Sequence, residues 1–88
     1  MSVVTDTQVL RLAEVRAATA SGEATRLRVE AQLSIGEVAR ACGVDQSTVW
    51  RWENGERRPR GNAALLYGQL IETLRQRATT SSTRADSA

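Results

Sequence analysis

The residues best suited to chemistry in this chain are its arginines, and the chemistry that they suit is the binding of phosphates and base edges. All 12 positive charges among the 88 residues are arginines, and four lie within one ten-residue stretch: Arg51, Arg57, Arg58 and Arg60. A guanidinium group offers a planar fork of donors that matches a phosphate or the edge of a guanine. A GC-rich genome also produces an arginine-rich composition, but composition alone does not explain this clustering.

The usual groups for acid–base, nucleophilic and metal-assisted catalysis are missing from the sequence. The chain has no histidine and no lysine, and Cys42 is its single cysteine. One cysteine cannot complete a metal cluster or an internal disulfide, and the scattered glycines form no phosphate-binding loop. We therefore expect a protein that is not an enzyme and that uses neither a cofactor nor a metal.

Length and composition indicate a single small helical domain. The chain is 41% hydrophobic but only 3% aromatic, which favours a core of Leu, Val and Ala in helices over a β-sandwich. No stretch approaches the length of a membrane span, and the N-terminus lacks the apolar run of a signal peptide. We expect a cytoplasmic protein without membrane contact. The net charge of +2 favours a localised basic face over indiscriminate coating of nucleic acid.

Helical periodicity and capping residues predict five helices, at about 6–20, 23–32, 34–42, 46–53 and 62–77. The predicted inward positions of the first, second and last helices are Val9, Leu12, Ala13, Ala17 and Ala20; Ala24, Leu27, Arg28 and Ala31; and Ala63, Leu66, Tyr67, Leu70 and Leu74. Arg16 interrupts the first of these stripes. Arg28 lies within the second, where a buried guanidinium needs a carboxylate partner.

The third and fourth helices form a closely joined pair. Ser34 and Glu37 have the spacing of a capping box, Gly43 suits the turn that ends the third helix, and Asp45 is a good N-cap for the fourth. In the helix at 46–53, helical spacing places Val49 and Trp52 on the inward face. The outward face contains Ser47, Trp50 and Arg51, with Asn54 directly after the helix. Two short helices joined by a tight glycine turn are the signature of a helix-turn-helix.

The stretch "LSIGEVARACGVDQSTVWRWENGERRP" resembles the helix-turn-helix of the lambda repressor/Cro (XRE-like) family of DNA-binding proteins. The resemblance runs from about Ala24 to Leu74. It implies an all-α, compact bundle of about five short helices in which helix 46–53 lies in the major groove of DNA. Three residues depart from the family pattern: Trp50, where a small polar residue is commoner; Ile35, where a phosphate-binding glutamine is common; and Gln32, where a glycine is common.

The resemblance also implies roles for particular residues. Gln46, Ser47 and Arg51 stand where the family reads base edges, and glutamine and arginine suit adenine and guanine respectively. Trp50 is unusual there, and it has three candidate roles: a DNA contact, a protein contact, or a ring stacked under an arginine of the loop. The expected phosphate contacts are Ser34, Thr48, Asn54, Arg57 and Arg58, with Arg60 a weaker candidate. The family also implies an interhelical ion pair between Arg28 and Glu53.

We expect residues 1–22 to be an N-terminal helical extension, 23–77 to be the DNA-binding domain, and 78–88 to be a disordered tail. The leading interpretation is a sequence-specific regulator of transcription, repressor-like and of host or phage origin, that binds double-stranded DNA and forms a homodimer at least on DNA. The alternative is an antitoxin-like or adaptor module that holds a protein partner through Trp50 and the N-terminal helix.

Overall fold

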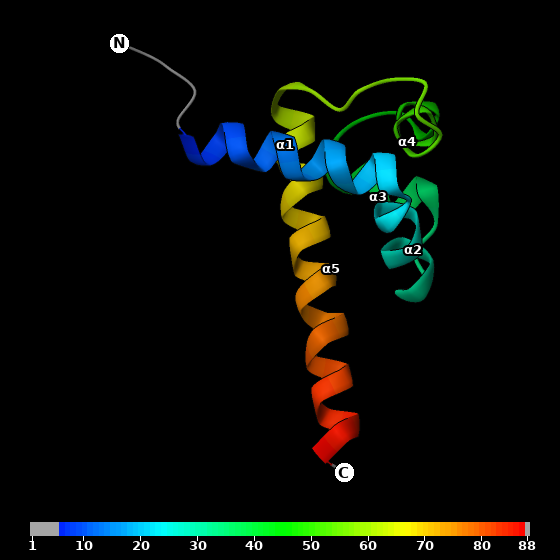
Figure 1. Ribbon diagram of the computed structural model, residues 1–88. Helices are drawn as coiled ribbons and strands as arrows, with labels where there is room; N and C mark the ends of the chain where they lie inside the picture. Colours follow the sequence, from blue (N-terminus) through cyan, green and yellow to red (C-terminus); the bar gives the residue numbers. More distant parts are fainter. Residues whose placement is uncertain (1–5, 88) are drawn as a thin grey trace.

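The computed structural model describes the backbone of residues 6–87 and the side chains of residues 6–79. The described residues contain no strand and form five helices: α1 (Asp6–Ser21), α2 (Glu23–Glu30), α3 (Ile35–Cys42), α4 (Gln46–Glu53) and α5 (Gly61–Ser87). Figure 1 shows α1 lying across the upper half of α5, with α2, α3 and α4 gathered beside them. The expected all-α bundle of about five helices is confirmed. None of the described helices is long and apolar enough to cross a membrane.

The hydrophobic core receives buried side chains from all five helices. Trp52 of α4 is only 3% exposed, and its ring lies 4.8 Å from the ring of Tyr67 on α5, centroid to centroid. Such a pair stabilises beyond the area that it buries, by about 0.5–1.5 kcal/mol. The rest of the core is built from smaller side chains: Val15, Ala18, Ala24, Leu27, Val38, Ala39, Cys42, Val49, Ile71 and Leu74. Trp52 is therefore a core residue, as its spacing predicts.

The inward face predicted for α1 is wrong. Val15 and Ala18 are the buried residues of this helix, whereas Val9 is 52% exposed and the alanines of the predicted stripe are exposed too. The reason is a close crossing between α1 and α5 at Gly68, where a Cβ atom would lie 2.5 Å from Val15 Cγ2. At this crossing the face of α1 that contains Val15 is buried. The polar residues on either side of Val15 in the sequence, Glu14 and Arg16, hide the apolar spacing of this face.

The first helix packs into the same core as the other four helices. Val15 and Ala18 belong to the same hydrophobic cluster as the buried residues of α2 to α5. A further tie joins α2 to α5, where the Arg75 guanidinium donates to both carboxylate oxygens of Glu23 at 3.0 and 2.8 Å. This hydrogen bonding lowers the pKa of Glu23. In the described part of the chain, α1 and the helices that follow it therefore share one hydrophobic core.

Helix α5 differs from its prediction in two ways. Its buried face contains Ala64, Tyr67, Ile71 and Leu74, while Leu66, predicted to face inward, is 38% exposed. The helix also continues to Ser87, where a disordered tail from residue 78 is expected; residue 88 lies outside the described residues. After Gly68 the sequence has neither glycine nor proline, so nothing interrupts propagation of a helix that is already nucleated by its packed first half.

Helix α2 ends in a strained turn at Gln32. Among the described residues, Gln32 is the one non-glycine residue in the left-handed region, with φ of 61°. The backbone N–H of Gln32 donates to Val29 O and that of Leu33 donates to Arg28 O, which is the hydrogen-bond pattern of a Schellman motif. The structure thus retains the turn that a glycine would make most easily and places a glutamine in it.

Candidate nucleic-acid interface

The turn between α3 and α4 sets the orientation of α4. Gly43 ends α3 with φ of 73°, and the backbone N–H of Val44 donates to Ala39 O at 3.0 Å. Ala39 is 2% exposed and Val49 is fully buried, so the two helices make close apolar contact just beyond the turn. Asp45 is the N-cap residue of α4, as predicted, but its side chain makes no capping hydrogen bond.

The start of α3 is held by the predicted capping box. The Ser34 hydroxyl oxygen accepts from the backbone N–H of Glu37 at 3.0 Å, and the backbone N–H of Ser34 donates to Glu37 Oε1 at 2.8 Å. The second of these bonds stabilises the carboxylate and lowers the pKa of Glu37. Because the Ser34 hydroxyl still has its own proton to donate, it can also contact an anion at this helix terminus.

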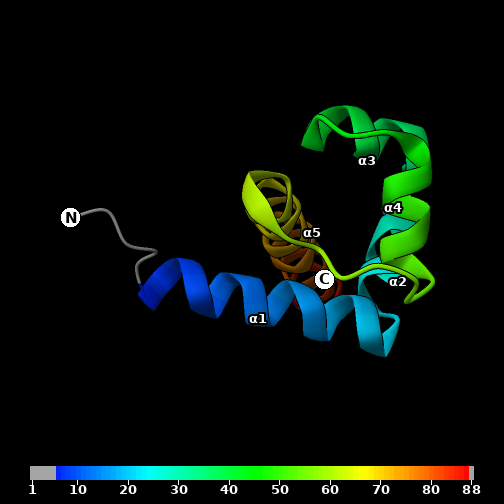
Figure 2. The same cartoon turned by 90° about the horizontal axis from the view of Figure 1, so that it is seen from above.

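The outer face of α4 presents the residues predicted to contact bases. Gln46, Ser47, Trp50 and Arg51 are all exposed, and Trp50 retains 46% of its accessible surface. Figure 2 shows α4 along one edge of the molecule, with α3 beyond its start. No stacking of an arginine on the Trp50 ring is found within the described side chains, where the one ring contact is that of Trp52 with Tyr67. The two remaining roles for Trp50 are contact with DNA and contact with a protein.

The side chain of Gln46 folds over the first turn of α3. A Cβ atom on Gly36 would lie 2.8 Å from Gln46 Nε2 and 3.4 Å from its Cδ. Only a residue without a side chain leaves this amide in place, because real Cβ atoms do not approach so closely. Gly36 therefore leaves room for this conformation of Gln46. The proximity is not visible in the sequence, because the two residues are ten positions apart and meet only through the packing of α3 on α4.

The residues predicted to contact phosphates fall into two groups. Ser34 and Thr48 lie at the starts of α3 and α4, and Thr48 is half-buried. Asn54 lies at the opposite end of α4, where its Nδ2 donates to Trp50 O at 2.8 Å and so ends the helix. Arg57 and Arg58 follow in the exposed loop between α4 and α5. In the described residues no ion pair involves either of these two arginines.

Arg28 and Glu53 are brought together by the fold. Arg28 Nε and Nη2 donate to the two carboxylate oxygens of Glu53 at 2.6 and 3.0 Å, and Nη1 donates to Leu33 O at 2.9 Å. The two side chains are only 15% and 5% exposed. These hydrogen bonds raise the pKa of Arg28. The pair thus joins the end of α4 to α2 and to the bend before α3, which fixes the angle at which α4 is presented.

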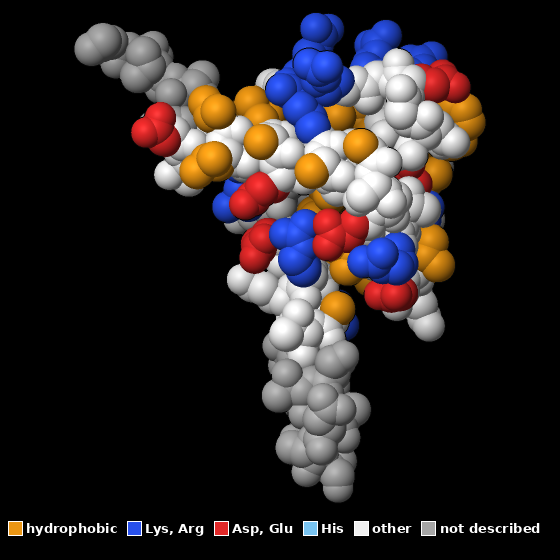
Figure 3. All heavy atoms as spheres, in the orientation of Figure 1, with side chains coloured by type: hydrophobic (Ala, Val, Ile, Leu, Met, Phe, Trp, Pro, Cys, Tyr) orange, Lys and Arg blue, Asp and Glu red, His pale blue; other side chains and the backbone are white. Residues whose placement is uncertain are grey.

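Positive charge gathers at the loop after α4. Figure 3 shows arginine side chains concentrated at the top of the molecule, where Figure 1 places this loop and the start of α5. Arg57, Arg58 and Arg60 line a hollow there together with Arg16 of α1. Arg16 was not among the site residues predicted from the sequence, where it only interrupts an apolar stripe that is not the buried face of α1.

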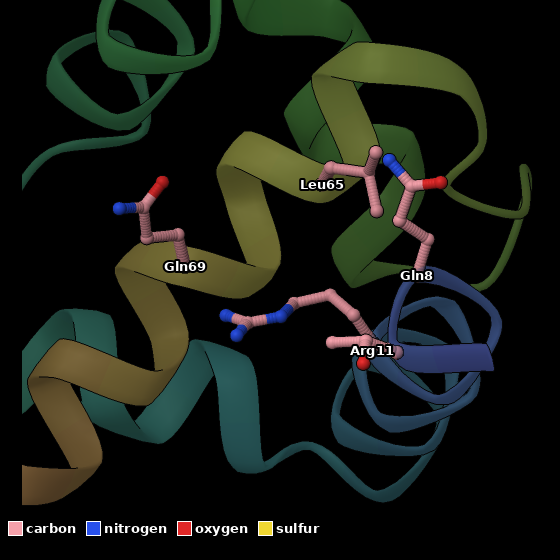
Figure 4. A pocket seen from close by; sticks show the side chains of 5 residues that line it. Gln8, Arg11, Leu65 and Gln69 are labelled. Atoms are coloured by element: carbon pink, nitrogen blue, oxygen red, sulfur yellow. The ribbon is translucent and has the colours of Figure 1, made fainter. Parts of the chain in front are cut away.

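Two buried titratable groups and a second hollow lie outside the face formed by α4 and its loop. Burial raises the pKa of the Cys42 thiol to about 11 and raises the pKa of Tyr67, so both side chains are protonated and unreactive at neutral pH. The second hollow lies between α1 and α5 and is lined by Thr7, Gln8, Arg11, Leu65 and Gln69 (Figure 4). The side chains that line it include no nucleophile–base pair.

Comparison with known proteins agrees with this geometry. A family model described as a helix-turn-helix domain matches residues 11–79. The match begins within α1 and ends within α5, so it spans the whole arrangement of packed helices and not α3 and α4 alone. Comparison with curated proteins and comparison with solved structures each gave no match.

Proposed function

Because the chain belongs to the helix-turn-helix domain family, whose members are DNA-binding regulators and not typically enzymes, we propose that it is a sequence-specific DNA-binding regulator that places α4 in the major groove. The observation that carries this proposal is the division of α4 into two faces. Val49 and Trp52 are buried in the core, while Gln46, Ser47 and Arg51 are exposed. A helix held so firmly from behind presents its outer side chains in a fixed register.

The side chains on the outer face suit direct reading of bases. Arg51 can donate two parallel hydrogen bonds to the O6 and N7 of guanine, and Gln46 can bond adenine through both ends of its amide. Ser47 accommodates several partners. Gly36 supports this assignment of Gln46, because it leaves room for the amide to lie beside the start of α3. We propose these three residues and Trp50 as the base contacts.

Phosphate contacts on both sides of α4 would hold it in the groove. Ser34 and Thr48 are proposed to bind backbone phosphates near the helix starts, and Asn54, Arg57 and Arg58 near the end of α4 and in the loop. A single helix-turn-helix covers few base pairs, and useful specificity usually comes from two half-sites one helical turn apart. We therefore also propose that the protein binds DNA as a homodimer, as a repressor-like regulator does.

Exposed apolar side chains support a second candidate function. Trp50 is 46% exposed, and Val9 and Leu10 on α1 are 52% and 63% exposed. A protein partner that covers these side chains would make the chain an adaptor or antitoxin-like module. The two candidates differ in their dependence on salt. Docking into the groove through several phosphate contacts weakens steeply as salt increases, whereas an apolar protein contact does not.

The experiment that tests the proposed function is competition between DNA sequences at near-physiological salt. A labelled duplex recovered as a binder would be displaced by unlabelled duplex of the same sequence at far lower concentration than by shuffled duplex, since specific binding typically exceeds non-specific binding by about 10³-fold or more. Equal displacement by both competitors would reject sequence-specific binding. Sedimentation of the protein with and without the duplex measures whether two chains bind each site.

A further inference from the structure

The arginine hollow defined by Arg16, Arg57, Arg58 and Arg60 has a volume of about 510 Å³ and no carboxylate in its lining. Its four cations come from two separate parts of the chain, one from α1 and three from the loop after α4. An adjoining hollow is lined by Arg16 together with Trp52 and Gly55 at the end of α4. The arginine hollow therefore begins where the proposed DNA-reading helix ends.

The arginine hollow is held in place by a hydrogen bond across these two parts. Arg16 Nε donates to Pro59 O at 3.0 Å, and Pro59 is fully buried, so the loop is anchored under the exposed arginines. Figure 2 shows the loop running from α4 to α5 alongside α1. With Nε used in this bond, the two terminal nitrogens of Arg16 have no hydrogen-bond partner within the described residues. They can therefore donate hydrogen bonds to another molecule.

The chemistry of the arginine hollow matches a phosphate group. Four guanidinium groups without counter-charges repel one another, and an anion relieves this repulsion. Arg26, Arg28 and Arg75 are each paired with a glutamate, whereas none of the four arginines of the hollow forms an ion pair in the described structure, and these four lie together. Arginine binds phosphate through two parallel hydrogen bonds, which are stronger than bonds between neutral groups.

We infer that α1 is part of the DNA interface, with Arg16 and the three loop arginines binding a backbone phosphate beside the bases that lie under α4. This inference rests on the proposed function and extends it to a helix outside the helix-turn-helix itself. It commits to DNA as the source of the phosphate because the arginine hollow adjoins the end of α4. The protein should therefore protect a longer stretch of DNA than α4 and the loop after it would protect without α1.

The test compares Arg16→Gln with Arg77→Gln in the full chain. Arg77 is exposed on α5 and makes no ion pair in the described structure, so its variant removes the same charge at a remote place. The dissociation constant on the recovered duplex is measured over a range of salt concentrations. Arg16→Gln should reduce the slope of log K against log salt by about 0.9, the value for one lost phosphate contact, and Arg77→Gln should leave it unchanged.

Neutral methylphosphonate linkages, placed one at a time along the duplex, locate the phosphate. At one position beside the bases the wild-type protein should lose affinity, and Arg16→Gln should lose less there, because only the three loop arginines still contact that phosphate. The inference is overturned if Arg16→Gln keeps the wild-type slope, including the case where affinity falls only because the loop is loosened. It is also overturned if inorganic pyrophosphate fills the arginine hollow without weakening DNA binding. If the wild-type protein binds no duplex specifically, the proposed function itself fails, which is a different result.

Discussion

The ion pair between Arg28 and Glu53 should contribute a large share of the free energy of unfolding of this small domain. Replacing Arg28 by methionine keeps most of the apolar stem but leaves Glu53 without its partner at a site where the glutamate side chain is 5% exposed. Two hydrogen bonds to this carboxylate are lost, at 2.6 and 3.0 Å, and hydrogen bonds to charged groups contribute roughly 1.5–3 kcal/mol each. We therefore expect Arg28→Met to lower the free energy of unfolding by about 3–5 kcal/mol.

The chain offers a matched control on the same helix. Arg26 and Glu30 approach only to 3.9 Å and are 61% and 58% exposed, so Arg26→Met should cost no more than about 0.5 kcal/mol. The double variant Arg28→Met/Glu53→Leu removes both buried charges and should recover most of the stability that the single variant loses, because burying two apolar groups avoids the cost of desolvating an ion.

Urea unfolding at 25 °C, followed through tryptophan fluorescence, measures all of these free energies. Trp52 reports directly on unfolding, since its ring leaves a buried contact with Tyr67. Small domains are stable by only about 5–15 kcal/mol, so the Arg28 variant should unfold at much lower urea, with a similar m-value if its native state is intact. A loss no larger than that of Arg26→Met would refute the reasoning, as would a double variant that is no more stable than Arg28→Met.

Four further predictions address the site and the core. Gly36→Ala should not lower the free energy of unfolding, because alanine is favoured over glycine in a helix by about 1 kcal/mol. It should relax the base preference at the position read by Gln46, because the new methyl group displaces the Gln46 amide. Thermal unfolding and sequence selection on this variant test the two expectations, and an unchanged base preference would contradict the assignment of Gln46. Gln32→Gly should raise the free energy of unfolding by about 1 kcal/mol, because it relieves the left-handed backbone at φ of 61°, and a fall in the urea midpoint would show that the glutamine is not strained. Arg51→Ala should lose about 1–3 kcal/mol of discrimination at one base position, whereas equal weakening on all sequences would make Arg51 a phosphate contact. Burial raises the pKa of Cys42 from 9.0 to about 11, so the unfolded chain releases this proton first and the free energy of unfolding should fall from about pH 9 to pH 11; Cys42→Ala should remove that part of the fall, and identical pH profiles would contradict it.

Local signals were enough to predict the helix-turn-helix. The capping box of Ser34 and Glu37, the left-handed Gly43 and the inward spacing of Val49 and Trp52 each depend on residues within one or two helical turns. For the same reason the bounds of α4 agree with the prediction. The resemblance to a known family then supplied the partner of Arg28, which spacing alone had left without one.

The features that sequence analysis missed depend on how separate helices pack. The buried face of α1 follows from its crossing with α5 at Gly68, where Val15 lies too close for any side chain on the glycine. Arg16 lies at the candidate site because α1 packs beside the loop, where its Nε donates to Pro59 O. Neither contact has a signal at helical spacing, since the residues involved are more than 40 positions apart. Helical spacing in a single sequence therefore does not show which face of α1 is buried or which helix that face meets.

Selection of bound sequences from a random pool of duplexes, at near-physiological salt, tests the central claim most directly. We predict recovery of a short motif, arranged as two half-sites about one helical turn apart, with one guanine position that loses its enrichment when Arg51→Ala replaces the wild-type protein. Recovery of a pool with no enriched motif, from protein that is folded by circular dichroism, would contradict the assignment of α4 as a base-reading helix and favour a protein partner held through Trp50.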